Sequence, residues 1–168
     1  MSHHYLPWVV GLIFSVVVGH LGVWLPMTQM RRAVGLGSEP RPSAWQPAAI
    51  GLVERTLFTA SILAGHAEFI AVWLGIKTVG TFNSWSPERM DELKVTNREI
   101  YSMFLLGQGL SIGFGVAGAY ATILLEANRV TPAGLLLGAT LLGAAAFTVW
   151  ICIEARRAER GRAQEVRN

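Results

Sequence analysis

Four long apolar segments alternate with polar connections along the 168-residue chain. A helix needs roughly twenty mostly apolar residues to cross about 30 Å of hydrocarbon, and each segment comes near that length. The segments predict membrane-spanning helices over residues 6–25, 51–76, 100–125 and 133–153. The pattern therefore favours an all-α integral membrane protein whose four transmembrane helices form one antiparallel bundle.

Composition agrees with this class, since 52% of the residues are hydrophobic and only 15% are charged. A soluble globular domain is usually less apolar and more charged. We interpret residues 1–168 as one membrane domain, with residues 154–168 forming a basic tail. The net charge of +3 is concentrated in loops and tail, which suits lipid headgroups and not nucleic acid. The single cysteine, Cys152, excludes a multi-cysteine metal site, and we expect no cofactor.

The basic residues also predict an orientation in the membrane. With four spans both termini share one side, and that side carries nine of the 14 Lys and Arg residues. Because cytoplasmic loops are enriched in these residues, we expect both termini in the cytoplasm, with the chain in a cell inner membrane. The first span alone argues the reverse, because Arg31 and Arg32 follow it. Between the second and third spans, Ser86 and Pro87 predict the start of a short surface helix.

Small residues at four-residue spacing predict where the helices touch, because close backbone approach holds helices together in a bilayer. In the third span one row is Gly107, Ser111, Gly115 and Ala119, and the other is Gly109, Gly113, Ala117 and Ala121. The fourth span carries Gly134, Gly138, Ala139 and Gly143. We expect these two spans to form a tight antiparallel pair. The rows suit a bundle or an oligomer interface equally well.

Ionisable residues within a membrane are costly and usually face protein or a water-filled cavity, so the second span is the candidate functional element. At about 100° per residue, His66 and Glu68 project about 200° apart, which predicts that they do not pair in a continuous helix. Glu68 shares a small-residue face with Gly65, and its expected depth matches that of Gln108 in the third span. We therefore predict a hydrogen bond between Glu68 and Gln108.

The other charged residues of this span lie nearer its ends. Arg55, His66 and Lys77 recur every eleven residues on one face, and the outer two can extend to the headgroups. Glu54 and Arg55 are candidates for contact with headgroups or an anionic ligand, or are plain interfacial residues. His66 is either a packed neutral imidazole or a ligand. Glu68 is either a protonated interhelical hydrogen bonder, a proton or ion relay, or a catalytic group. No metal or phosphate-binding motif accompanies them.

One stretch of the second span resembles a group of known proteins. Glu54 and Arg55 open a helix that ends with Trp73, Leu74 and Lys77, and this pattern is similar to that of uncharacterised small bacterial four-helix integral membrane proteins. The resemblance implies a fold and no activity. In size and span count the chain is also similar to membrane enzymes of eicosanoid and glutathione metabolism. Their Arg, Asn and Glu pattern is missing here, so no glutathione site is implied.

Three functions remain open from the sequence. The first is a structural or accessory inner-membrane protein with no chemistry of its own, whose partners are the lipid bilayer and either further copies of itself or another membrane protein. The second is a small transporter or proton-conducting protein that uses Glu68, with Gln108 and His66 beside it. The third is a membrane enzyme acting on a lipophilic substrate.

Overall fold

The computed structural model describes residues 5–34, 45–82 and 97–165, and these residues form helices without any strand. The helices are α1 (Leu6–Ile13), the π-helical η1 (Phe14–Val18), α2 (Gly19–Ala33), α3 (Trp45–Leu63), α4 (Glu68–Phe82), α6 (Asn97–Glu126) and α7 (Val130–Glu165). The all-α prediction is therefore confirmed. The surface helix predicted from Ser86 lies outside the described residues.

Within the described residues, three helices are long and apolar enough to cross a membrane. They are the continuous helix Leu6–Ala33, which comprises α1, η1 and α2, and the segments Tyr101–Glu126 of α6 and Val130–Arg157 of α7. These segments correspond to the first, third and fourth predicted spans, although the third begins one residue later than predicted. The basic tail begins as helix, because α7 continues to Glu165.

The second predicted span is wrong as a single helix. Residues 51–76 are divided between α3 and α4, which are joined by a turn at residues 64–67. The break comes at Gly65, whose φ of +80° is a left-handed conformation that disfavours residues with a Cβ. The amide N–H of His66 bonds the Ser61 carbonyl, and that of Gly65 bonds the Ile62 carbonyl. This pair of bonds is the Schellman motif, which ends helices.

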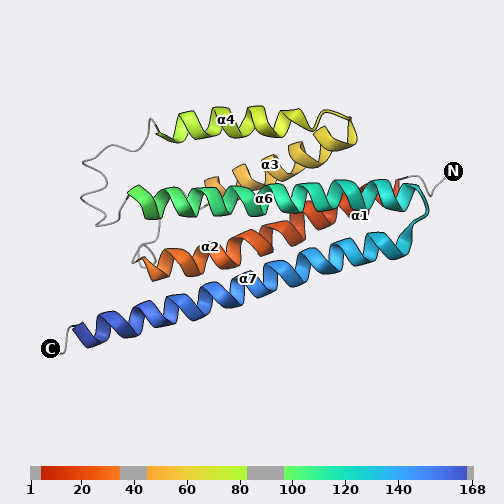
Figure 1. Cartoon of the computed structure of the whole chain (residues 1–168). Coiled ribbons are helices and arrows are strands. Elements are labelled where there is room, and N and C mark those ends of the chain that lie inside the picture. The colour runs from red at the N-terminus through yellow and green to blue at the C-terminus, as the bar shows by residue number, and fades with distance from the viewer. Residues whose placement is uncertain (1–4, 35–44, 83–96, 166–168) are drawn as a thin grey trace.

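When α1, η1 and α2 are counted as the one continuous helix that they form, the described helices alternate in direction along the chain (Figure 1). As a result, α3 and α6 run parallel to one another (Figure 1). Helix α6 is central and packs against α1, α2, α3 and α7. Helix α1 begins and α7 ends at opposite ends of the molecule (Figure 1). The prediction that both termini share one side depended on four passes, and the extra helix produced by the break at Gly65 removes that basis.

Glycines allow the closest contact between α1 and α6. A Cβ on Gly118 would lie 2.6 Å from the Gly11 carbonyl oxygen, and a Cβ on Gly11 would overlap Thr122 Oγ1. Further along, Gly19 leaves room for Arg55 and for Phe114, and Phe114 packs against Phe14 in the apolar core. The backbones of α1 and α6 therefore touch, as expected for helices that associate without water.

The small-residue rows of the third span behave differently from one another. Ser111, Gly115 and Ala119 are buried in the bundle, and Gly107 packs against Met27. In the second row Ala117 and Ala121 are buried, whereas Gly109 and Gly113 are exposed and a Cβ on either would meet no atom within 4 Å. One row is thus used within the bundle, and half of the other faces outward.

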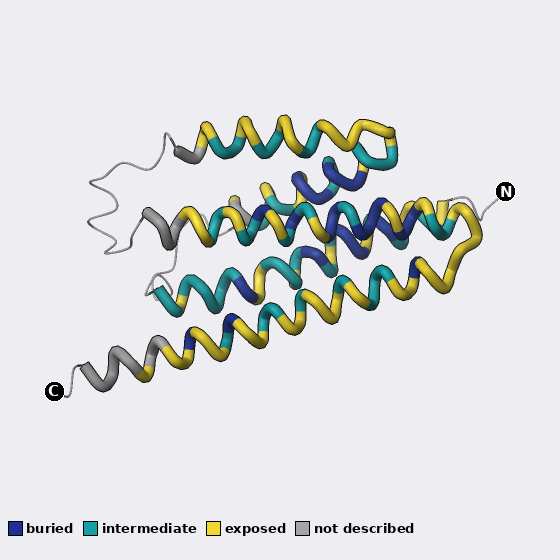
Figure 2. Tube along the Cα trace, in the orientation of Figure 1, coloured by how far each residue is buried: buried dark blue, intermediate teal, exposed yellow. Residues whose placement is uncertain are grey.

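Helix α7 packs beside α6 and α2, but the glycines predicted to mediate its contact do not do so. A Cβ on Gly134, Gly138 or Gly143 would have no neighbour within 4 Å. The buried residues of α7 are instead Ala133, Ile151 and Ala155, and much of the helix is exposed (Figure 2). The four-residue spacing therefore identified a row of small residues on α7. It did not predict which side of α7 faces the bundle.

Candidate functional site

The helix break at Gly65 brings His66 and Glu68 together at the exposed turn between α3 and α4. His66 Nδ1 lies 3.1 Å from Glu68 Oε1, and both side chains are 73% exposed. The prediction that these residues do not pair is therefore wrong, because it assumed a continuous helix. The pKa of the Glu68 carboxyl is lowered, first by a hydrogen bond from its own backbone N–H and then by the bond with His66.

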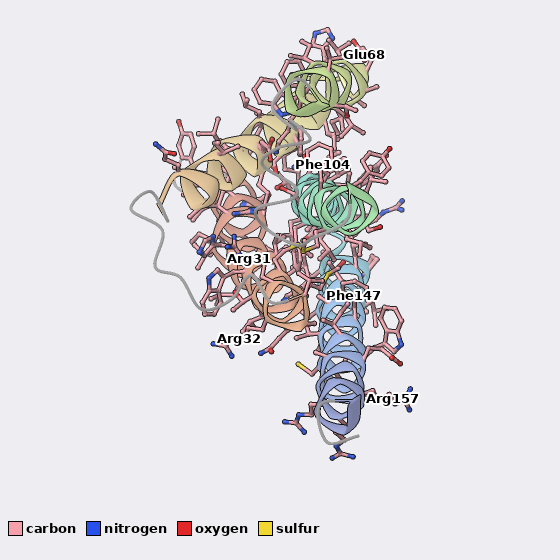
Figure 3. All side chains as sticks on the ribbon, turned by 90° about the vertical axis from the view of Figure 1, so that its left-hand side faces the viewer. Arg31, Arg32, Glu68, Phe104, Phe147 and Arg157 are labelled. Carbon is pink, nitrogen blue, oxygen red and sulfur yellow. The ribbon has the colours of Figure 1, made fainter. Side chains whose placement is uncertain are left out.

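The predicted hydrogen bond between Glu68 and Gln108 does not form. Glu68 lies on the outer side of α4 (Figure 3), whereas Gln108 is buried in α6. Gly115 packs against Phe58, and this contact fixes the register of the parallel helices α3 and α6. At 1.5 Å per residue, the Glu68 turn and Gln108 are then about 18 Å apart along the bundle axis.

The buried carboxylate is instead Glu54, which is 2% exposed and faces α4. Its Oε1 accepts hydrogen bonds from Lys77 Nζ at 2.5 Å and from Trp73 Nε1 at 3.0 Å. Lys77 also lies over the ring of Phe104 in α6, with Nζ 5.8 Å from the ring centre. Phe104 projects from α6 toward α4 (Figure 3). The pair Glu54–Lys77 therefore joins α3 to α4 beside α6, and neither side chain lies free at a headgroup surface.

Arg55 projects about 100° away from Glu54 around α3 and is also 2% exposed. Its Cδ lies against Gly19 of α2, and its guanidinium lies over Gly51, one turn earlier in α3. Within the described part of the chain, Arg55 Nε and Nη2 have no hydrogen-bond partner. Because a buried charge without a partner is strongly disfavoured, this guanidinium is the most unusual group in the molecule.

Buried hydroxyls connect three helices beside Arg55. Thr59 Oγ1 lies 2.8 Å from Ser15 Oγ and 3.2 Å from the Gly115 carbonyl oxygen, and Ser15 Oγ lies 3.4 Å from the Arg55 carbonyl oxygen. Ser15 occupies the π-helical turn η1, a wide turn frequently found at functional sites. These bonds hold the backbone of α3 at Arg55 against α6 and the first helix.

Two more buried polar side chains of α6 face α3. Gln108 and Ser111 project within about 40° of Gly115 around the helix, and Gly115 contacts α3. Gln108 Oε1 and Ser111 Oγ have no hydrogen-bond partner among the described residues. We take as the candidate site the three buried polar side chains with atoms that lack a hydrogen-bond partner among the described residues, Arg55 on α3 and Gln108 and Ser111 on α6, together with the Glu54–Lys77 pair; this set is called the buried polar cluster.

Among the residues predicted from the sequence, Glu54, Arg55, Lys77 and Gln108 belong to this region, whereas His66 and Glu68 form a separate exposed pair. The structure adds three residues with buried or partly buried polar contacts that the sequence did not predict: Ser15, Thr59 and Trp73. Ser15 was detectable, because Gly11, Ser15 and Gly19 form a small-residue row in the first span. Thr59 and Trp73 had no comparable signal, since their partners come from other helices.

No group of three or more His, Cys, Asp or Glu residues that could hold a metal ion occurs in the described ranges. Comparison of the chain with protein-family models, with curated proteins and with solved structures finds no match in any of the three. What the fold and site define is a class: a helical protein with three helices suited to crossing a membrane and a buried polar cluster between α3 and α6.

Proposed function

We propose that this protein is a small bacterial inner-membrane protein that works by associating with a second copy of itself, as a structural or accessory component with no chemistry of its own. The observation that carries the proposal is the pair Gly109 and Gly113, one turn apart on the outward side of α6. Leu105 and Tyr120 on the same helix are also exposed. This association face, defined by these four residues, is apolar and carries no side chain at its two glycines.

The contrast between the two small-residue rows of α6 supports this proposal. The row containing Ser111 and Gly115 is covered by helices of the same chain. Gly109 and Gly113 have the spacing that allows close backbone approach in membranes, but no helix of the described chain covers them. We infer that a second helix covers these glycines, because helix backbones can approach closely where side chains are small and gain van der Waals contact there.

A second copy is favoured because copies of one protein share one orientation in the membrane. A two-fold axis along the membrane normal then brings the same face of each copy together. Two α6 helices meet in parallel in such a dimer, which is the arrangement of right-handed pairs with glycines four residues apart. The relay alternative is less favoured, because Glu68 lies on an exposed turn about 18 Å from Gln108.

The test is replacement of both glycines in the association face, as Gly109→Leu with Gly113→Leu. Association is measured by energy transfer between copies labelled at Cys152, the single cysteine of the sequence, in vesicles of fixed protein-to-lipid ratio. We expect the double variant to dimerise about tenfold more weakly or worse, a loss of about 1.4 kcal/mol, because the leucine side chains would hold the two backbones apart.

Gly75→Leu is the matched control, because Gly75 is also exposed and a Cβ there meets no atom within 4 Å. Its association should equal that of the natural protein. If the double variant associates as well as the control, the proposed face is wrong.

A further inference from the structure

Arg55 carries a buried charge that the described residues around it balance only in part. Glu54, next to it in sequence, attracts it electrostatically, but the Glu54 carboxylate accepts its hydrogen bonds from Lys77 and Trp73 on α4. Because the Glu54–Lys77 pair is neutral overall, Arg55 leaves one net positive charge among these three residues. Ile50, Leu52 and Val53 on the same helix are exposed apolar residues and supply no negative charge.

The register of α3 and α6 places more polar groups at the same level. Gly115 is opposite Phe58, and Ser111 lies one turn, or about 6 Å, before Gly115. The Arg55 guanidinium also extends one turn back from its own backbone, over Gly51. Gln108, about 10.5 Å before Gly115, is therefore level with the guanidinium, and Ser111 lies about 4.5 Å from that level, on the side toward Gly115.

Neutral groups in the cluster cannot remove the charge. A hydroxyl or an amide oxygen can accept a hydrogen bond from Arg55, but neither carries a negative charge. An oxyanion does both, and a guanidinium binds carboxylate or phosphate oxygens through two parallel hydrogen bonds. The Ser111 hydroxyl and the amide group of Gln108 can donate to the remaining oxygens of the same ligand.

Gly51 is the position on α3 at which we expect an anion to approach the Arg55 guanidinium. A Cβ at this position would have only the Arg55 guanidinium within 4 Å, with Nη1 at 3.3 Å, and Gly51 itself is partly exposed. Because Gly51 has no side chain, the position that its Cβ would occupy is open beside the guanidinium, and we call this open position the notch. A larger side chain at residue 51 would cover this notch without changing any charge.

We propose that Arg55, Ser111 and Gln108 form an oxyanion-binding site, reached through the notch at Gly51, for a phosphate group. The phosphate is that of a lipid headgroup or of a free phosphate ion, which present the same oxygens to the guanidinium. This site is independent of the association face on the outward side of α6, so the Gly109/Gly113 double variant should still bind phosphate.

The experiment measures thermal unfolding of the full chain in an uncharged detergent. One arm adds inorganic phosphate against potassium chloride of equal ionic strength, and the other adds phosphatidylglycerol against an uncharged diacylglycerol. We expect the melting temperature to rise by about 5 °C near saturation in one arm or in both. A response to phosphate alone identifies a free-ion site, and a response to phosphatidylglycerol alone identifies a headgroup site.

The variants are Arg55→Gln, which removes the charge, and Gly51→Leu, which retains the charge and covers the notch. Both should lose the rise, whereas Arg157→Gln, which removes an exposed arginine, should retain it. Gly51→Leu keeps the test decisive if Arg55→Gln does not fold. The proposal is overturned if neither addition raises the melting temperature above its control, or if Gly51→Leu responds like the natural protein.

Discussion

At the scale of single residues, two glutamates 14 positions apart in this chain have opposite surroundings. Glu54 is buried with two hydrogen-bond donors, while Glu68 is exposed beside His66. An exposed ion pair contributes little to stability. A buried carboxylate depends on its cation, because removal of one partner leaves a charge that water no longer stabilises.

We expect Lys77→Met to lower the free energy of unfolding by about 3 kcal/mol, because Glu54 would stay buried without its cation. Denaturant unfolding in detergent micelles measures the change. Arg157→Met is the control, since the Arg157–Glu154 pair is exposed, and its effect should stay below about 0.5 kcal/mol. Equal effects for the two variants would mean that the Glu54–Lys77 pair is unimportant to stability.

At the scale of elements, one residue decides whether residues 51–76 form one helix or two. Gly65 adopts a positive φ, and the carbonyls of Ser61 and Ile62 accept the bonds that end α3. Asn128 has a φ of +56° in the turn between α6 and α7, where the same pair of bonds joins Arg129 to Leu124 and Asn128 to Leu125. The two hairpins whose turns lie within the described residues therefore use one kind of helix end.

Gly65→Ala should destabilise the fold by about 1 kcal/mol, because a Cβ disfavours the left-handed conformation. No atom lies within 4 Å of that Cβ, so the cost comes from the backbone alone. The free energy of unfolding is compared with that of Gly75→Ala, which lies in the open part of helix α4 and should be neutral or slightly more stable. A neutral result for Gly65→Ala would contradict the observed turn.

At the scale of the whole molecule, α6 organises the bundle by presenting different residues to each neighbour. Gly118 lies against α1, Gly115 lies against α3, and Gly113 lies against no described helix. The same residue type therefore performs three different tasks within six positions. Position around the helix, and not the presence of glycine, determines each task.

Gly118→Ala should be among the most damaging small substitutions, because its Cβ would lie 2.6 Å from the Gly11 carbonyl oxygen and 2.8 Å from Ser15 Cβ. Overpacking against the α1 backbone should lower the free energy of unfolding by about 2 kcal/mol or more. Gly134→Ala in α7 is the matched variant, because a Cβ there meets no atom within 4 Å, and it should leave the free energy of unfolding nearly unchanged. Comparable melting temperatures for the two would argue against close contact between α1 and α6.

The sequence by itself determined the helical class and three apolar segments, because length and hydropathy are local properties of the chain. It also singled out Gln108 as a polar residue within a span, and Glu54, Arg55 and Lys77 as candidate residues that were expected at the membrane interface. Their partners were not predictable, because Glu54 and Lys77 come together only when α3 folds back onto α4. Helical periodicity failed at His66 and Glu68 for the same reason, since it assumed that the helix continues through Gly65.

Tertiary structure alone decided which charges are balanced. Glu54 and Arg55 are adjacent in sequence, but a turn of about 100° between them sends one toward α4 and the other toward α2 and α6. Glu54 meets Lys77 there, whereas Arg55 lies against Gly19 and Gly51, and its Nε and Nη2 have no hydrogen-bond partner among the described residues. The sequence supplied the charges, and the packing of the helices left one of them available for an anion.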